Sequence, residues 1–176
     1  MKIAILTIVL CFAASLAFGQ KSQINPAYKI RASKGGVTVT YQGKAHRLNV
    51  GEHIDAARVR NTEVLFANQK DGFRYLVIGV SGDSRDSDYD RQCGAGIESN
   101  FIWLKLDAAW KIVDTKSVRY ESCWSGIDPD GPFKVTKTMM TMAFTNSRDD
   151  VRTKLTYNAD EPEKGFQLEE TKIEDQ

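Results

Sequence analysis

Apolar and polar residues alternate along most of the chain after residue 36, in short segments separated by turn residues. Alternation with a period of two is typical of β-strands that bury one face. The segments are VTVTYQGKAHRLNV (37–50), TEVLFANQ (62–69), FRYLVIGVS (73–81), IESNFIWLKLD (97–107), WKIVDTKSVRYES (110–122), FKVTKTMMTMAFT (133–145), VRTKLTYN (151–158) and GFQLEETKI (165–173). No helical pattern of about 12 residues separates them, which argues against β-α-β units. The sequence predicts an all-β fold, a single antiparallel β-sandwich or barrel-like domain.

Two tight turns are visible in this pattern. Asp71-Gly72 separates two apolar runs, and Gln42-Gly43 interrupts the first alternating segment. Both dipeptides favour the backbone of a β-hairpin turn. The segment 73–81 carries apolar residues on both of its faces, so we expect a central strand that is covered on both sides.

The segments 97–107 and 110–122 predict a hairpin that folds about Ala108. That register places Trp103 opposite Val113, so that apolar residues meet across the strands. Cys93 and Cys123 are equidistant from Ala108, and opposed strand residues lie within the range that a disulfide spans. The sequence therefore predicts a disulfide that staples the open end of this hairpin.

The first residues, MKIAILTIVLCFAASLAFGQ, have the form of a secretory signal peptide. A basic Lys2 precedes an uncharged apolar run, and Ala17-Phe18-Gly19 offers small residues before a cut ahead of Gln20. An uncleaved anchor is the alternative, but the run is short for a bilayer span. We therefore expect an exported protein, periplasmic or extracellular, with a signal peptide at 1–19, a flexible lead-in or edge segment at 20–35 and an antiparallel β domain at 36–176.

Charge and cysteine content limit the partners of the mature chain. The whole sequence has 24 basic and 23 acidic residues, and the leader removes one basic residue and no acidic one. A neutral chain does not attract nucleic acid or an anionic membrane over its whole surface. We expect no nucleic-acid partner, and no membrane partner after cleavage. Two cysteines remain after cleavage, which favours a disulfide in an exported protein.

The stretch SGDSRDSDYDRQCGAG (81–96) carries the densest group of acidic residues near a cysteine. Clustered carboxylates suit calcium, which takes six to eight oxygen ligands. The helix-loop-helix version of such a site fails, because Arg91 stands where a glycine is needed and Ile97 where a glutamate is needed. A solvated connector and a charged recognition loop are the alternatives. The calcium hypothesis concerns Asp83, Asp86, Asp88 and Asp90, and no other cofactor is indicated.

Signatures of catalysis are weak in this sequence. His46 and His53 lack a third metal ligand at metal-binding spacing, and no serine lies in a nucleophile elbow. No glycine loop of the phosphate-binding type is present. We predict no catalytic residue, and the sequence favours a protein that is not an enzyme.

Aromatic residues of the disulfide hairpin give a second hypothesis. Phe101 and Trp103 share one strand face, and Tyr120 and Trp124 lie near the stapled end. If that face is open, these four rings form a partner-binding surface. The alternative is a sandwich whose opposite sheet covers them.

Three classes of function follow. The first is a secreted or periplasmic binding module that recognises a protein or a surface glycan through the loops next to the disulfide. The second is a structural, envelope-associated domain without a discrete ligand, and the third is a hydrolase without a recognisable motif. A stapled hairpin gives loops a rigid base and lowers the ordering cost of binding, so we favour the binding module.

Overall fold

The structure is a computed structural model that describes residues 27–51, 53, 58–84, 93 and 96–173. The expected signal peptide at 1–19 lies outside the described residues. In chain order the elements are β1 Tyr28–Ser33, β2 Gly36–Tyr41, β3 Lys44–Leu48, β4 Val59–Lys70, β5 Phe73–Asp83, β6 Ile97–Leu106, β7 Ile112–Ser122, β8 Ile127–Pro129, β9 Lys134–Val135, β10 Met139–Asn146, β11 Val151–Asn158, the 3-10 helix η2 Pro162–Lys164 and β12 Gln167–Lys172.

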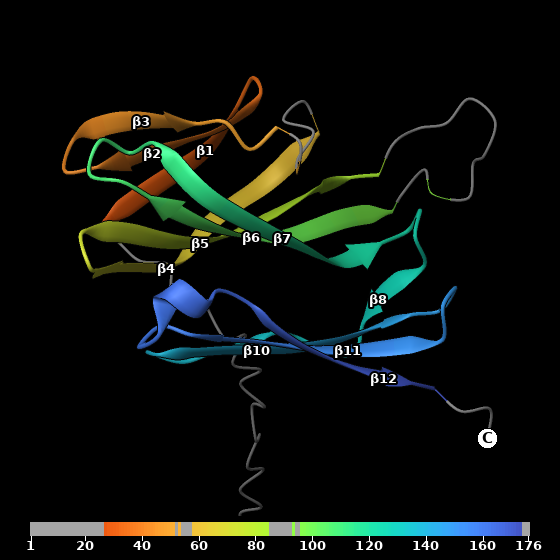
Figure 1. Ribbon diagram of the computed structural model, residues 1–176. Coiled ribbons are helices and arrows are strands. Elements are labelled where there is room, and N and C mark those ends of the chain that lie inside the picture. Colours follow the sequence, from red (N-terminus) through yellow and green to blue (C-terminus); the bar gives the residue numbers. More distant parts are fainter. Residues whose placement is uncertain (1–26, 52, 54–57, 85–92, 94–95, 174–176) are drawn as a thin grey trace, which may run out of the picture.

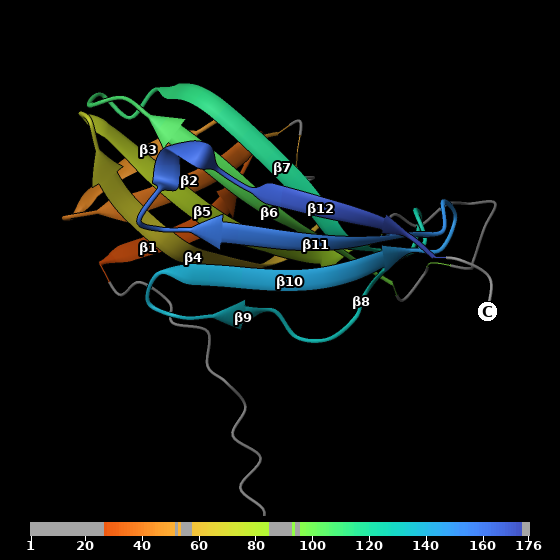
Figure 2. The same cartoon turned by 60° about the horizontal axis from the view of Figure 1, so that its bottom comes forward.

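The strands form two antiparallel sheets that pack as three layers (Figure 1). A three-stranded sheet has the order β1-β2-β3, and a nine-stranded sheet has the order β12-β11-β10-β8-β7-β6-β5-β4, with β9 on β10. The larger sheet bends at β8, which meets β7 only at Ser122 and Ile127. As a result β10–β12 lie across β4–β7 (Figure 2). The predicted antiparallel sandwich is confirmed, and neither sheet closes on itself.

Apolar residues on both faces of β5 and β6 make these strands the centre of the molecule. Leu76 and Ile78 face the β1–β3 layer, while Tyr75 and Val77 face the β10–β12 layer. Each fully buried aliphatic side chain of this kind contributes about 1.5–3 kcal/mol relative to exposure. The prediction that 73–81 is covered on both faces is thereby confirmed.

The two predicted tight turns are also confirmed. Tyr41 pairs with Lys44 across Gln42-Gly43, and Lys70 pairs with Phe73 across Asp71-Gly72. Both central residues of each turn have positive φ angles, between 49° and 79°. This is the turn type whose twist matches that of the flanking strands.

The first strand lies inside the segment expected as a lead-in or edge. Residues 28–33 form β1, which pairs only with β2 and is an edge strand of the smaller sheet. The β structure therefore begins ahead of residue 36. The ring of Tyr28 stacks on Tyr41 at 4.6 Å between centroids.

The predicted register of the β6–β7 hairpin is wrong. Trp103 pairs with Lys116 rather than Val113, and Leu106 pairs with Ile112. The strands do not turn about Ala108, because the loop extends from Asp107 to Lys111. Register shifts between Ser99 and Asn100 and between Lys105 and Leu106 move the pairing further. Such bulges bend a strand and increase its local twist.

The loop between β6 and β7 is held by one aspartate and one tryptophan. Asp107 Oδ1 accepts hydrogen bonds from the backbone N–H groups of Ala109 and Lys111, at 2.9 and 2.8 Å. Trp110 has a φ of 66°, a left-handed conformation that is unfavourable for a bulky residue. Its indole contacts His46 of β3 and Arg74 of β5. These contacts bind the β1–β3 layer to the central layer.

Candidate functional site at the disulfide

The disulfide between Cys93 and Cys123 is confirmed. Its Cα atoms lie 5.6 Å apart and 30 residues separate the cysteines. Cys123 directly follows β7, but Cys93 precedes β6 by several residues and is not its cross-strand partner. A turn brings Cys93 back, since Gly96 N donates to its carbonyl oxygen at 3.0 Å.

Gly96 packs directly against the bridge. A Cβ atom at this position would lie 2.6 Å from Cys123 Cβ and 2.9 Å from Ser84 Oγ. Only a residue without a side chain fits so close to the disulfide. Glycine is therefore required here for close approach.

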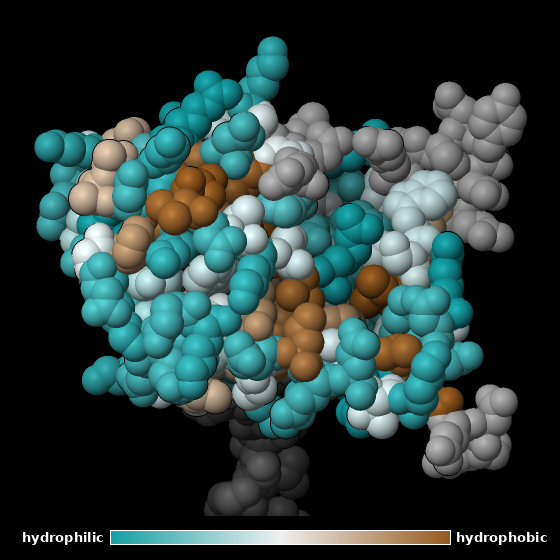
Figure 3. Space-filling model, in the orientation of Figure 1, coloured by the Kyte–Doolittle hydropathy of each residue, from teal (hydrophilic) through white to brown (hydrophobic). Residues whose placement is uncertain are grey.

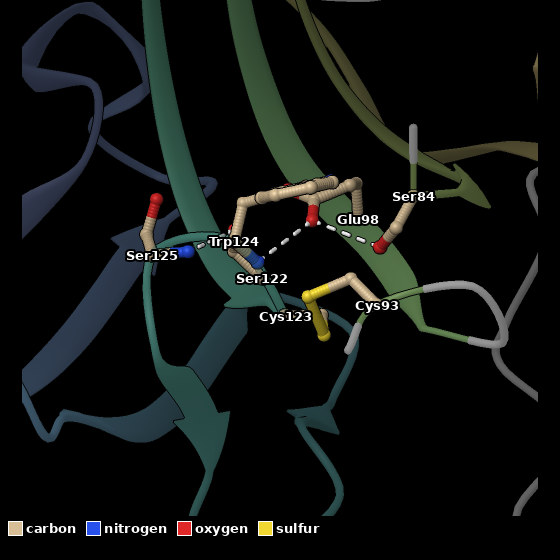
Figure 4. Close-up of a disulfide and its surroundings, with 7 residues drawn as sticks. All are labelled: Ser84, Cys93, Glu98, Ser122, Cys123, Trp124 and Ser125. Carbon is tan, nitrogen blue, oxygen red and sulfur yellow. Dashed lines mark hydrogen bonds between the residues drawn. A yellow bond between two sulfur atoms is a disulfide. The ribbon is translucent and has the colours of Figure 1, made fainter. Parts of the chain in front are cut away.

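Glu98 of β6 organises the chain segments around the disulfide (Figure 4). Ser84 Oγ donates to Glu98 Oε1 at 3.0 Å, and Trp124 N donates to the same oxygen at 3.4 Å. The Arg119 guanidinium lies 3.8 Å from Glu98 Oε2. The carboxylate side chain is only 20% exposed, so its bonds to Ser84 and Trp124 are more strongly favoured than they are in water. One side chain thus joins the end of β5, the strand β7 and the loop after Cys123.

Trp124 follows the bridge and lies in a turn closed by Ser125 N donating to Ser122 Oγ at 3.0 Å (Figure 4). The residue is half-buried. Within the described part of the chain, its Nε1 is shielded from solvent and has no hydrogen-bond acceptor. A shielded donor without an acceptor is costly, and a ligand that supplies an acceptor would relieve this cost.

A second carboxylate, that of Glu121 in β7, lies next to this network on the side that faces the β10–β12 layer. Ser99 is buried, and its Oγ donates to Glu121 Oε2 at 2.8 Å. Glu63 lies farther along the same face, where its side chain packs over Gly79. The disulfide end of the molecule is therefore lined with acidic and hydroxyl groups.

The four aromatic residues of the partner-binding hypothesis do not share one open face. Phe101 and Trp103 are 0% and 1% exposed, because the β10–β12 layer covers them. The prediction that they contact a partner is therefore wrong, and the alternative of a covering sheet is correct for both. Tyr120 is half-buried and stacks on Phe101 at 4.2 Å between centroids, and burial raises the pKa of its hydroxyl to about 12. Of the four rings, Trp124 remains as the candidate contact residue.

The acidic residues of the calcium hypothesis are only partly within the described chain. Asp86, Asp88 and Asp90 lie outside it. Asp83 is described, and its carboxylate pairs with Arg60 Nε at 2.6 Å. Among the described residues no group of three or more histidine, cysteine or acidic side chains has the arrangement of a metal site.

A hollow of about 370 Å³ lies at the far end of the molecule, between the β4–β5 and β6–β7 turns. Lys70, Asp71, Arg74 and Asp107 line it. Lys70 already pairs with Glu163 at 2.7 Å, and Asp107 holds its own loop. The mixture of charges defines no ligand class, so this hollow is not the favoured site.

Sequence reasoning missed Ser84, Glu98 and Arg119. The predicted register placed different residues beside the disulfide, and nothing in the local sequence marks Glu98 as buried. The alternation of β6 is the one usable signal, since it places Glu98 and Asn100 on the same strand face. The tertiary contact with Trp124 has no local signature.

No protein-family model, curated protein or solved structure matches this chain. The class of protein is therefore defined by fold and site alone: a sandwich-like all-β protein with one disulfide. That disulfide is compatible with an oxidising, exported environment. In the part of the chain that the structure describes, no helix has the length and apolar character needed to cross a bilayer.

Proposed function

We propose that this protein is an exported binding module that recognises a protein or a surface glycan through the loops next to the Cys93–Cys123 disulfide. The observation that carries the proposal is the Glu98 network. One partly buried carboxylate, with the disulfide beside it, fixes Ser84, Arg119 and Trp124 relative to one another. Loops that are ordered before binding lose less conformational entropy when the ligand arrives.

The chemistry of the site supports recognition rather than turnover. Trp124 offers a half-buried ring and an N–H donor without an acceptor in the described structure. Tryptophan is enriched among residues that dominate binding energies. Glu98 and Arg119 provide both signs of charge at the rim, which favours a ligand rich in hydroxyl or amide groups.

The proposal is tested by binding of the oxidised protein, produced from the full chain, to an array of surface glycans and to a displayed peptide library. We expect Trp124→Ala to lower affinity for the selected ligand by at least about tenfold, the usual loss at a residue that dominates binding. Its midpoint of thermal unfolding should change little. Val113→Ala, at an exposed position of the far end, is the matched control and should bind as the unaltered protein does.

Two outcomes oppose the proposal. If Trp124→Ala unfolds as readily as a variant without the disulfide, Trp124 is a structural residue. If both probes give no ligand, or a ligand that Trp124→Ala and Val113→Ala bind equally well, the site at the disulfide is not the recognition site.

A further inference from the structure

The charge of the protein is unevenly distributed between its layers. Residues 27–51, which contain β1–β3, hold no aspartate or glutamate. The same segment holds five basic residues, Lys29, Arg31, Lys34, Lys44 and Arg47, although the whole chain has a net charge of only +1. The β1–β3 layer is therefore a local cationic region on a nearly neutral protein.

Strand alternation brings three of these cations to the outer face of the layer. Arg31, Thr38 and Arg47 form one row across the three strands, and Lys29 lies in the next row with Thr40. All three cations are exposed, and hydrophilic side chains project over β1–β3 at the top of Figure 3. Successive residues on one strand face are about 6.6–6.8 Å apart. The charges are thus spread over an open sheet surface.

These cations are not neutralised within the described chain. The ion pairs of the described residues involve Arg60, Lys70, Arg119, Arg152, Lys154 and Lys164 and none of the basic residues of the β1–β3 layer. Arg47 donates to a neutral acceptor, the carbonyl oxygen of Lys34. The positive potential of this face is therefore available to an external anion.

The aromatic residues of the layer point away from this face. Tyr28 is buried, Tyr41 stacks on it, and His46 stacks on Trp110. Among its described residues, the outer face thus has no ring to stack a nucleic-acid base, no large apolar side chain to enter a membrane and no aromatic anchor for a protein partner. Hydroxyl groups of Thr38 and Thr40 lie between the cations instead.

We infer that the outer face of β1–β3 binds an acidic polysaccharide, a chain whose carboxylate or sulfate groups repeat along its length. Lysine and arginine provide the attraction, and the threonine hydroxyls exchange hydrogen bonds with sugar hydroxyls. A repeating polyanion needs no deep pocket, because many weak contacts act together along the chain. This surface is distinct from the disulfide site, so a negative result for one proposal does not contradict the other.

The test measures binding of the protein produced from the full chain to immobilised polygalacturonate, with neutral dextran as the reference surface. We expect saturable binding to polygalacturonate that weakens steeply with added salt, and no binding to dextran. Lys29→Gln combined with Arg31→Gln should weaken binding by about tenfold. It should also reduce the slope of log affinity against log salt by about two, one for each lost contact.

The matched control is Lys134→Gln combined with Lys137→Gln, which removes the same charge from exposed positions outside the β1–β3 layer. It should bind within about twofold of the unaltered protein. A second pair, Lys34→Gln with Arg47→Gln, changes an exposed turn residue and the outer-face cation of β3 in the same layer and should also weaken binding. This pair keeps the test decisive if the β1 variant fails to fold.

Three results would overturn the inference. One is the absence of binding to polygalacturonate at low salt. Another is an equal loss in the Lys134 and Lys137 control, which would show that net charge alone matters. The third is tighter, β1-dependent binding to phosphatidylglycerol vesicles or to duplex DNA, which would assign the face to a membrane or to nucleic acid.

Discussion

The imidazole of His46 stacks on the indole of Trp110, with ring centroids 3.8 Å apart and ring planes 7° apart. The Arg74 guanidinium lies 4.3 Å from the centroid of the same indole. His46 of the β1–β3 layer and Arg74 of the central layer therefore both contact the indole of Trp110. This contact explains how Trp110 is maintained in a left-handed conformation that its side chain disfavours.

This contact predicts that stability depends on pH. Burial, then the charges of Arg74 and Lys44, lower the pKa of His46 below its usual value. Below about pH 6.5 the unfolded chain then binds more protons than the folded one. The contribution of His46 is present above that pH and is lost as the pH falls through the lowered pKa. Thermal melts at about pH 7.5 and 5.5 should show a drop in midpoint, smaller in His46→Phe, which retains a ring without a titrating group.

His53→Gln is the matched control for this experiment, because it removes the other histidine and leaves the stack intact. It should keep the full drop in midpoint. An unchanged drop in His46→Phe would show that His46 does not cause the pH dependence.

Reduction of the disulfide should lower stability substantially. The bridge closes a loop of 30 residues, which corresponds to about 3–4 kcal/mol in the chain-entropy model. Urea denaturation with and without a reductant measures this difference. Cys93→Ser combined with Cys123→Ser should behave like the reduced protein and should not respond to reductant. Equal midpoints for the oxidised and reduced forms would contradict a stabilising role for the bridge.

Gly96→Ala should destabilise the protein by about 1–3 kcal/mol, because the new methyl group has no room beside the disulfide. Its Cβ would lie 2.6 Å from Cys123 Cβ. Gly79→Ala is the matched control, since the atoms nearest to it belong to the flexible side chain of Glu63, at 3.2 Å. Urea melts of the two variants should rank Gly96→Ala as the less stable, and the reverse order would contradict the packing described here.

Removal of the Tyr157 hydroxyl should leave stability unchanged or raise it. Tyr157 is fully buried, and its hydroxyl has no hydrogen-bond partner among the described residues. Burial also raises the pKa of this hydroxyl. Deleting an unsatisfied buried group relieves a desolvation cost of about 1–3 kcal/mol, partly offset by lost packing. Urea denaturation of Tyr157→Phe checks this, and a loss of more than about 1 kcal/mol would indicate a bound water or ligand at the hydroxyl.

Thermal melts in excess calcium and in excess chelator address the acidic loop. We expect the two melts to coincide, because Asp83 is already paired with Arg60 and leaves three aspartates of the cluster. Calcium binding at a hundredfold excess over its dissociation constant would add about 2.7 kcal/mol and move the midpoint by several degrees. A shift that Asp88→Asn abolishes would assign a metal to this loop instead.

Strand positions and tight turns were predictable because both depend on local chemistry. Alternation located β11 at 151–158, and Asp71-Gly72 located the β4–β5 turn. The β6–β7 register was not predictable, and the reason is again local. A turn of this kind usually has glycine at its left-handed position, but Trp110 occupies it and is maintained there by residues distant in sequence.

The disulfide was predicted from a register that the structure does not contain. In the observed pairing β6 begins at Ile97, and both register shifts leave their extra residue in β7. The hydrogen bond from Gly96 N to the Cys93 carbonyl oxygen lies beside the bridge to Cys123. The prediction succeeded because two cysteines in one exported domain usually pair, whatever the register. The contacts of Glu98 were not predictable, because each joins segments separated by more than ten residues.

The burial of β5 on both faces has a consequence for amide exchange. Its residues pair with β4 on one side and β6 on the other, and two further layers cover its faces. We therefore expect these N–H groups to exchange with solvent through unfolding of the whole domain. β12 pairs only with β11 and all six of its residues are exposed, so its amides exchange by local fraying. The ratio of the two exchange rates reports how far the free energy of global unfolding exceeds the free energy of local opening at β12.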